Sequence, residues 1–398
     1  MKVIALYLPQ YHEIKENDEW WGEGYTEWTS LKKGVPYIEG QYQPRVPLNK
    51  NYYDLTDINV MRWQAKIAKE NGVYGFCFYH YWFNGHKLLE KPLEQYLGHK
   101  DIELPYYFCW ANETWTRVWE GDKNPKVLIE HNYEDLQDVD DHFYYCLKFF
   151  KDPRYMKKNN KPVFSIYNPI AMPTNKTKHM VTRWNELAKK EGFDGIVFMY
   201  LCAESMCFMT EKQKSYFDYG VEYQPSYAQH LEDDVRQMRK HYAKVKLSKY
   251  LSNHVGPIVK LFSGIKKIIS NSSDNEQEET MIAEVKTIRS YDADWESALS
   301  VEHDDYSKYI PGGFVDWDNT PRRGRKGKVL IGATPQKFEQ YMERLIIRAR
   351  DLYHSDEIVL FAWNEWSEGG YLEPDEKYGY AYLNALKQAL INTNEFPE

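Results

Sequence analysis

Two glutamates three residues apart form the part of this chain best suited to chemistry. They lie in the segment Trp363-Asn364-Glu365-Trp366-Ser367-Glu368-Gly369-Gly370, directly after the apolar run 359–362. Paired carboxylates can supply the acid and the base for a glycosidic bond, and glycine lets the backbone approach a ligand closely. The sequence therefore predicts Glu365 and Glu368 as catalytic residues, with Asn364 and Trp366 as substrate contacts.

The alternative role for the two glutamates is structural, because acidic side chains are favoured in the first turn of a helix. Gly369 and Gly370 follow at once, and two glycines disfavour a continuing helix. The glycine pair therefore favours the catalytic interpretation.

A second set of polar and aromatic residues lies at the ends of other apolar runs. Asn112-Glu113, framed by Trp110 and Trp115, can bind sugar hydroxyls or act as an acid, and helix capping is the alternative. Lone histidines are more often core or surface residues than ligands. With these alternatives open, the further predicted substrate contacts are Tyr7, His12, Trp28, His80, Trp82, Trp110, Asn112 and Glu113.

The segment Asp316-Trp317-Asp318-Asn319-Thr320-Pro321-Arg322 leaves two functions open. We predict that Asp316, Asp318 and Arg322 hold sugar hydroxyls. In the alternative they hold a metal ion and a diphosphate, as in a metal-dependent nucleotide-sugar glycosyltransferase. A third alternative is a non-catalytic glycan-binding barrel. The histidines and cysteines lack the spacing of a zinc site, and we predict no metal or cofactor.

The composition favours a soluble globular protein that binds sugars. The 398 residues carry a formal net charge of −8, and 16% of them are aromatic; the negative charge argues against nucleic acid as a partner. Five cysteines form no paired framework, so we expect a reducing compartment. Neither a signal-peptide pattern nor a run of about 18 apolar residues occurs, and the predicted location is cytoplasmic.

Apolar strands that alternate with amphipathic helices predict an α/β fold, a (β/α)8 or TIM-type barrel. The expected strands are Val3–Leu8, Tyr74–Tyr79, Pro105–Trp110, Pro162–Tyr167, Gly195–Tyr200, Val221–Gln224, Phe314–Trp317 and Ile358–Trp363. The expected helices are Leu55–Glu70, Leu88–Leu97, Tyr133–Phe150, Lys176–Glu191, Thr334–Tyr353 and Asp375–Leu390. A doubly wound open sheet is the alternative, but no Gly-rich nucleotide loop follows the first strand.

An elaborated basic helical insertion, residues 226–311, is expected before the seventh strand of one catalytic domain spanning 1–398. Within it, residues 235–270 are rich in lysine and arginine with interleaved apolar residues. One interpretation is a solvated face of a long loop. The other is an arm that contacts a membrane surface or an anionic, lipid-linked acceptor, which would place the protein at the inner face of the membrane.

Four segments in chain order resemble the WbsX family, bacterial proteins described as glycosyltransferases of O-antigen and capsule biosynthesis. They are residues 6–12 (LYLPQYH), 110–113 (WANE), 317–322 (WDNTPR) and 363–369 (WNEWSEG). That family is in turn similar to glycoside hydrolase family 99, the endo-α-mannosidases and endo-α-mannanases. The resemblance spans the whole chain and implies a (β/α)8 barrel that acts on an oligo- or polysaccharide with retention.

The resemblance also implies roles for the two glutamates. Glu365 would deprotonate the sugar 2-hydroxyl, which attacks the anomeric carbon to form a 1,2-anhydro sugar. Glu368 would protonate the leaving group and later act as base for the acceptor, while Asn364 would orient a hydroxyl or a carboxylate. Because water or a sugar hydroxyl can capture the intermediate, such a site can either break or make a glycosidic bond.

Overall fold

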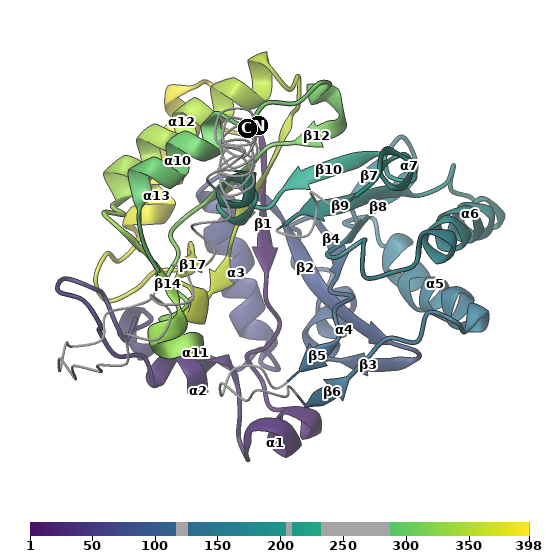
Figure 1. The fold of residues 1–398 in the computed structure, drawn as a ribbon, viewed down its shortest axis with the longest axis horizontal. Helices are drawn as coiled ribbons and strands as arrows, with labels where there is room; N and C mark the ends of the chain where they lie inside the picture. Colours follow the sequence, from purple (N-terminus) through teal and green to yellow (C-terminus); the bar gives the residue numbers. More distant parts are fainter. Residues whose placement is uncertain (117–125, 204–208, 232–286, 398) are drawn as a thin grey trace, which may run out of the picture.

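Nine parallel strands surrounded by helices form a nearly closed barrel (Figure 1). The computed structural model describes residues 1–116, 126–203, 209–231 and 287–397. Around the barrel the strands follow the order β12-β10-β9-β8-β4-β2-β1-β15-β13. Their bounds are β1 Lys2–Tyr7, β2 Val73–Phe83, β4 Tyr106–Trp110, β8 Lys161–Ile166, β9 Val197–Cys202, β10 Tyr219–Glu222, β12 Tyr309–Ile310, β13 Gly312–Phe314 and β15 Glu357–Phe361. The predicted (β/α)8 fold is confirmed.

One position of the barrel is shared by β12 and β13, which only Pro311 separates. β12 pairs with β10, and β13 pairs with β15, so the two short strands together act as the seventh of eight. The sequence prediction for this strand, Phe314–Trp317, was too late in the chain. At Gly312 a Cβ atom would lie 1.7 Å from the carbonyl oxygen of Glu222, so the close approach of the two strands requires glycine, a residue atypical of strands.

Amphipathic helices cover the outside of the barrel. They are α3 Ile58–Glu70, α4 Lys91–Gly98, α5 Leu136–Phe150, α6 Thr174–Lys190, α10 Tyr291–Leu299, α12 Pro335–Asp351 and α13 Ala381–Asn392. The hydroxyl of Thr334 accepts a hydrogen bond from the Lys337 amide and caps α12, and Pro335 is at its first position, as the sequence predicts.

Helix α10 lies inside the predicted insertion and was not expected from the sequence. Its Trp295 is fully buried and stacks on Phe314 of β13 at 4.6 Å between ring centroids, and on Tyr341 of α12 at 5.3 Å. It therefore packs as one of the barrel's outer helices. Residues 232–286, with the basic segment 235–270, lie outside the described residues.

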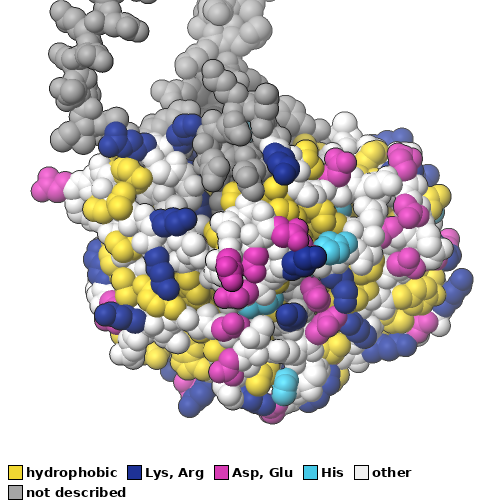
Figure 2. Space-filling view, turned by 90° about the horizontal axis from the view of Figure 1, so that it is seen from below, with side chains coloured by type: hydrophobic (Ala, Val, Ile, Leu, Met, Phe, Trp, Pro, Cys, Tyr) yellow, Lys and Arg dark blue, Asp and Glu magenta, His cyan; other side chains and the backbone are white. Residues whose placement is uncertain are grey.

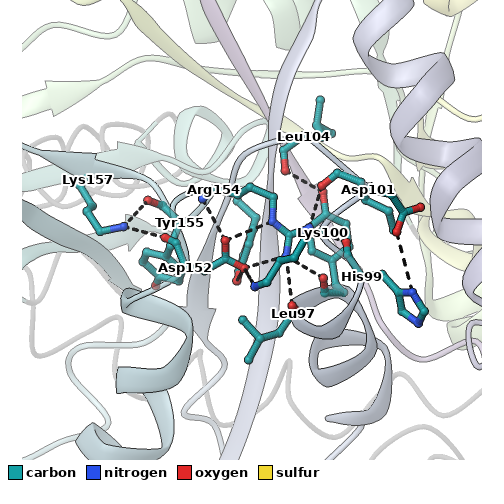
Figure 3. A network of polar contacts seen from close by, with 12 residues as sticks. Leu97, His99, Lys100, Asp101, Leu104, Asp152, Arg154, Tyr155 and Lys157 are labelled. Carbon is teal, nitrogen blue, oxygen red and sulfur yellow. Dashed lines mark hydrogen bonds and ion pairs between the residues drawn. The ribbon is translucent and has the colours of Figure 1, made fainter.

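A buried ion-pair network fixes the end of the barrel where β4 and β8 begin (Figure 3). The guanidinium of Arg154 donates to both carboxylate oxygens of Asp152 and to carbonyl oxygens at the C-terminus of α4 and beyond it. Lys100 donates to the same carboxylate at 2.8 Å. Arg154 thus satisfies helix-end carbonyls that have no intrahelical donor.

The opposite end of the barrel, to which the strands point, carries the short helices α1 Lys15–Trp21, α2 Glu27–Lys32 and α11 Thr320–Arg323 (Figure 1). Both chain termini lie at the other end. In (β/α)8 barrels the end with the strand carboxyl termini holds the active site. None of the helices in the described ranges is long and apolar enough to span a bilayer.

Candidate active site

A cavity of about 760 Å³ opens at the carboxyl ends of the strands. Figure 2 shows this face, on which acidic and basic side chains lie close together. The charged residues that line the cavity are Glu113, Arg322, Arg323, Lys326, Lys328, Glu365 and Glu368. The aromatic residues that line it are Tyr79, Tyr81, Trp115, Tyr167, Tyr223 and Trp317. A cavity of this size with aromatic walls and a few charged groups suits several sugar rings.

The segment after β15 brings the two glutamates into this cavity. The side chain of Asn364 accepts a hydrogen bond from the Leu8 amide at 2.8 Å and donates to the Leu8 carbonyl at 3.0 Å, which ties the segment to the end of β1. A single 3-10 turn, Trp366–Glu368, then reverses the chain. It ends at Gly369, whose φ of +73° is left-handed and favours glycine. The pair of glycines thus ends a turn rather than a long helix.

The buried carboxylate of Glu373 holds the two tryptophans of this segment, Trp363 and Trp366. The two oxygens of Glu373 accept hydrogen bonds from Trp363 at 3.1 Å, Trp366 at 2.6 Å, Gln64 at 2.7 Å and Tyr53 at 2.8 Å. Burial raises the pKa of Glu373 to about 7, although these hydrogen bonds lower it. Four donors on one carboxylate leave little freedom to the backbone that carries Glu365 and Glu368.

Arg322 is the centre of the site's electrostatics. It contacts Glu368 at 2.5 Å, Glu27 at 2.5 Å and Glu365 at 3.5 Å. Burial raises the pKa of Glu365 well above its ordinary value; Arg322 opposes this, whereas the nearby Glu368 and Glu27 add to it. A carboxylate with a raised pKa is a stronger base, which suits removal of a proton from a hydroxyl.

Three buried polar atoms of the cavity walls have no hydrogen-bond partner among the described residues. They are Glu365 Oε2, Trp317 Nε1 and Asn168 Oδ1. Buried polar groups are nearly always hydrogen-bonded, so such exceptions call for a partner. All three atoms belong to residues that line the cavity, and Glu365 Oε2 lies 3.5 Å from the Arg322 guanidinium.

The sequence as a whole matches a known family at this point. A family model described as Glycosyltransferase WbsX matches residues 3–386. The chain belongs to this family. Two curated relatives, each an uncharacterized protein WxcX from a strain of Xanthomonas campestris pv. campestris, are 33% identical to this WbsX-family protein over 390 residues. The match covers 98% of the chain but 49% of each relative, so the chain spans about half their length.

Solved structures share the fold of this WbsX-family protein. A GH99 endo-alpha-mannosidase from Bacteroides thetaiotaomicron has a TM-score of 0.54 at 13% identity, over 99% of this chain and 97% of that chain. A glycoside hydrolase-like protein has a TM-score of 0.53 at 12% identity, over 98% and 93%. At these identities the likeness shows the barrel fold alone. Membership of a family described as Glycosyltransferase WbsX links the protein to enzymes that act on glycosidic bonds.

Of the predicted site residues, the structure brings Glu365, Glu368, Arg322 and Glu113 to the cavity. The carboxylate of Glu113 accepts a hydrogen bond from Asn168 at 3.0 Å. The other predicted contacts lie behind the cavity wall, in contrast to the expectation from the sequence: Tyr7, His12, Trp28, His80, Trp82, Trp110, Asn112, Asp316, Asp318, Asn364 and Trp366.

Strand β2 shows the physical reason for this placement. Because side chains alternate between the two faces of a strand, Tyr79 and Tyr81 line the cavity whereas His80 and Trp82 point outward to α5. Trp82 donates to Asp138 of α5 at 2.8 Å, and His80 contacts another α5 residue. The strand is also longer than predicted, so both residues lie inside it rather than beyond its end.

The same alternation moves the other predicted contacts away from the cavity. Tyr7 donates to Gln64 of α3 at 2.6 Å, while its neighbour Leu8 lines the cavity. Asn112 bonds the backbone of Asn168, and Trp110 donates to a backbone carbonyl of β2 at 3.2 Å.

Three further predicted contacts, His12, Trp28 and Trp366, have local structural roles. His12 contacts the carbonyl of Pro9 at 3.1 Å, and burial lowers its pKa to about 4. Trp28 donates to the carbonyl of Tyr53 at 2.7 Å and packs on Trp366. Trp366 stacks on Tyr371 at 3.8 Å between ring centroids. These three side chains pack behind the cavity wall and support it.

Asp316 and Asp318 are also occupied by protein partners. Asp316 forms an ion pair with Arg45 at 2.6 Å and accepts from the Trp317 amide. Both oxygens of Asp318 accept hydrogen bonds, from two glutamines and from Thr320. Every carboxylate oxygen of the two aspartates thus already has a partner within the protein.

One cluster among the described residues has ligand atoms close enough for a metal ion. The ligand atoms of His80, His142 and Cys146 lie within 4.8 Å of one another, all buried. The Nε2 atoms of the two histidines lie 2.9 Å apart, and burial lowers the pKa of His80 to about 3. A neutral histidine pair that shares a hydrogen bond accounts for this arrangement, and it does not line the cavity.

The sequence reasoning missed several residues of the site. Glu27, which forms an ion pair with Arg322 at 2.5 Å, was not among the predicted site residues. Trp317, Asn168, Arg323 and Lys326 also line the cavity and were not among the predicted substrate contacts. These residues lie in loops and short helical turns after the strands, where no periodicity indicates which side chains face the cavity.

Proposed function

We propose that this WbsX-family protein makes or breaks a glycosidic bond with retention of configuration, using Glu365 as base and Glu368 as acid. The observation that carries the proposal is the pair of carboxylates on one arginine, in an aromatic-walled cavity. The raised pKa of Glu365, caused first by burial, supports the base role. The partly exposed Glu368, at 20% of its side chain, can exchange a proton with solvent.

The acid role sets one requirement on Arg322. In the substrate-free structure Glu368 is ion-paired with it at 2.5 Å, so Glu368 must part from the guanidinium to carry a proton to a leaving oxygen. A glycan oxygen that replaces Glu368 on Arg322 would allow this. The same guanidinium also donates to Glu27 through its Nε and Nη2 atoms.

The proposed setting is bacterial surface-polysaccharide metabolism, O-antigen or capsule, on an oligo- or polysaccharide that includes lipid-linked forms. Membership of the WbsX family supports it. The proposed location is cytoplasmic, at the inner face of the membrane, and contact through 235–270 stays a prediction from the sequence.

Incubation of the purified protein with fluorescently tagged α-linked oligosaccharides, with and without EDTA, tests the reaction class. We expect cleaved or transferred products in both conditions, with a first-formed product that keeps the α-configuration by NMR. Products only with added Mn²⁺ and a nucleotide sugar would favour the transferase alternative. Tight binding without turnover would favour the glycan-binding barrel.

A further inference from the structure

The cavity carries its charges on separate parts of the barrel rim. Glu113 follows β4, and Arg323, Lys326 and Lys328 follow β13. In the strand order β4 and β13 lie on opposite sides of the barrel. The acidic and cationic ends of the cavity are therefore separated across its mouth, with Glu365 and Glu368 after β15, next to β13.

The cationic end of the cavity is formed by the loop between Trp317 and Leu330, whose backbone is fixed by hydrogen bonds. The amide of Leu330 donates to the carbonyl of Trp317 at 2.8 Å, and the Lys328 amide donates to Asn319 Oδ1 at 2.8 Å. A Cβ on Gly327 would lie 2.9 Å from the Asn319 side chain, so the loop is closely packed at its base. The two ends of the loop are thus joined, and the backbone that carries Arg323 and Lys326 is held at the rim of the cavity.

The cationic side chains of this loop differ in whether they form ion pairs with carboxylates of the protein. Arg322 contacts Glu27, Glu365 and Glu368. Arg323 and Lys326 are exposed at the cavity, with no carboxylate within ion-pair distance among the described residues. Two unpaired cations beside the reacting centre favour a ligand that supplies the negative charge.

Resting on the proposed function, we propose that the substrate is an acidic glycan, whose carboxylate or phosphate group binds Arg323 and Lys326 beside the bond that reacts. The anionic group would occupy the β13 side of the cavity, and neutral sugar rings would occupy the aromatic wall near β4 and β8. A uronic acid and a phosphorylated sugar share this chemistry, and the experiment separates them.

Equilibrium binding to three fluorescent α-linked oligosaccharides tests the inference without requiring turnover. One carries a uronic acid, the second is the same compound with the carboxyl group reduced to an alcohol, and the third is neutral except for a phosphate. We expect one anionic probe to bind about three- to tenfold tighter than the reduced probe, as partly exposed charge pairs allow. The difference should shrink when salt is raised from about 0.05 M to about 0.5 M.

The double variant R323Q/K326Q should lose this preference. Arg325→Gln is the matched control, because Arg325 is on the same loop but packs over Tyr37 outside the cavity; it should keep the preference. Equal binding of all three probes, or a preference that survives in R323Q/K326Q, would overturn the inference. Anion-selective binding without any product would instead contradict the proposed function and leave the acidic-glycan site standing.

Discussion

Replacing Arg322 with methionine would leave three carboxylates of the site without the guanidinium they share. The side chain of Arg322 is 12% exposed and that of Glu27 is 0% exposed. Removing one partner of a buried ion pair costs about 3–5 kcal/mol, because the other charge stays buried and uncompensated. We therefore expect Arg322→Met to lower the free energy of unfolding by about 3–5 kcal/mol at pH 7.

Arg344→Met supplies a matched control. Arg344 forms an ion pair of similar length with Glu296, at 2.6 Å, but these side chains are 50% and 56% exposed. Exposed pairs contribute about 0–1 kcal/mol. Urea denaturation of both variants, followed by tryptophan fluorescence, measures the difference. Equal losses in the two variants would refute the reasoning that burial sets the cost.

The pH dependence of the Arg322→Met penalty provides a second readout. Burial already raises the pKa of Glu365 above its unfolded value, and loss of the guanidinium removes the group that opposes this. A raised pKa in the folded state means stability that is present below the unfolded pKa and lost as pH rises through the folded pKa. The penalty should therefore be smaller at pH 5 than at pH 8. A penalty that grows on acidification would contradict this sign.

Three further predictions address the support of the site, the base of the barrel and the cavity wall. Glu373→Gln should lower the free energy of unfolding by about 2–3 kcal/mol, because its amide group would face four donors. Since the pKa of Glu373 is about 7, the free energy of unfolding of the wild type should fall between about pH 5 and 8. This fall should be weaker in Glu373→Gln, and an equal fall in the two proteins would contradict the prediction. Burial raises the pKa of Asp152, but the hydrogen bonds from Arg154 and Lys100 outweigh this and lower the pKa to about 2. The stabilising contribution of Asp152 should therefore be present above about pH 4 and lost towards pH 2. In acid titrations of the free energy of unfolding, Arg154→Met should lack this loss between about pH 4 and 2. Trp317→Ala should weaken oligosaccharide binding about fivefold in anisotropy titrations, as expected for one aromatic contact, and Trp317→Phe should recover most of it; full affinity in Trp317→Ala would remove this residue from the sugar site.

Most of the barrel could be predicted from the sequence because each buried parallel strand is a continuous apolar run. The runs at β1, β4, β8 and β15 are of this kind and are buried along nearly their whole length. The seventh strand could not be placed well, because Pro311 interrupts it and two glycines form its core. Helix α10 was hidden in the long region before it, where no strong periodicity separates it from its surroundings.

The site was harder to predict than the fold because both faces of these strands are buried. Composition identifies the polar and aromatic residues near a strand end, but not which face each one takes. At His80 and Tyr79 of β2, neighbours of similar chemical interest take opposite faces, and the sequence favoured the one that faces away from the cavity. Glu365 and Glu368 could be predicted because the glycines after them indicate a turn that returns both to one cavity.

The rate of bond cleavage by Glu368→Gln tests the central claim most directly, with two substrates of the sugar identified by the oligosaccharide panel. One is an unactivated α-glycoside and the other is the glycosyl fluoride, whose leaving group needs little protonation. The account predicts a loss of about 10²–10⁴-fold on the unactivated glycoside and a much smaller loss on the fluoride, whereas Glu365→Gln should lose activity on both. Retention of more than about 10% of wild-type activity on the unactivated glycoside by Glu368→Gln would contradict the assignment of this residue as the acid.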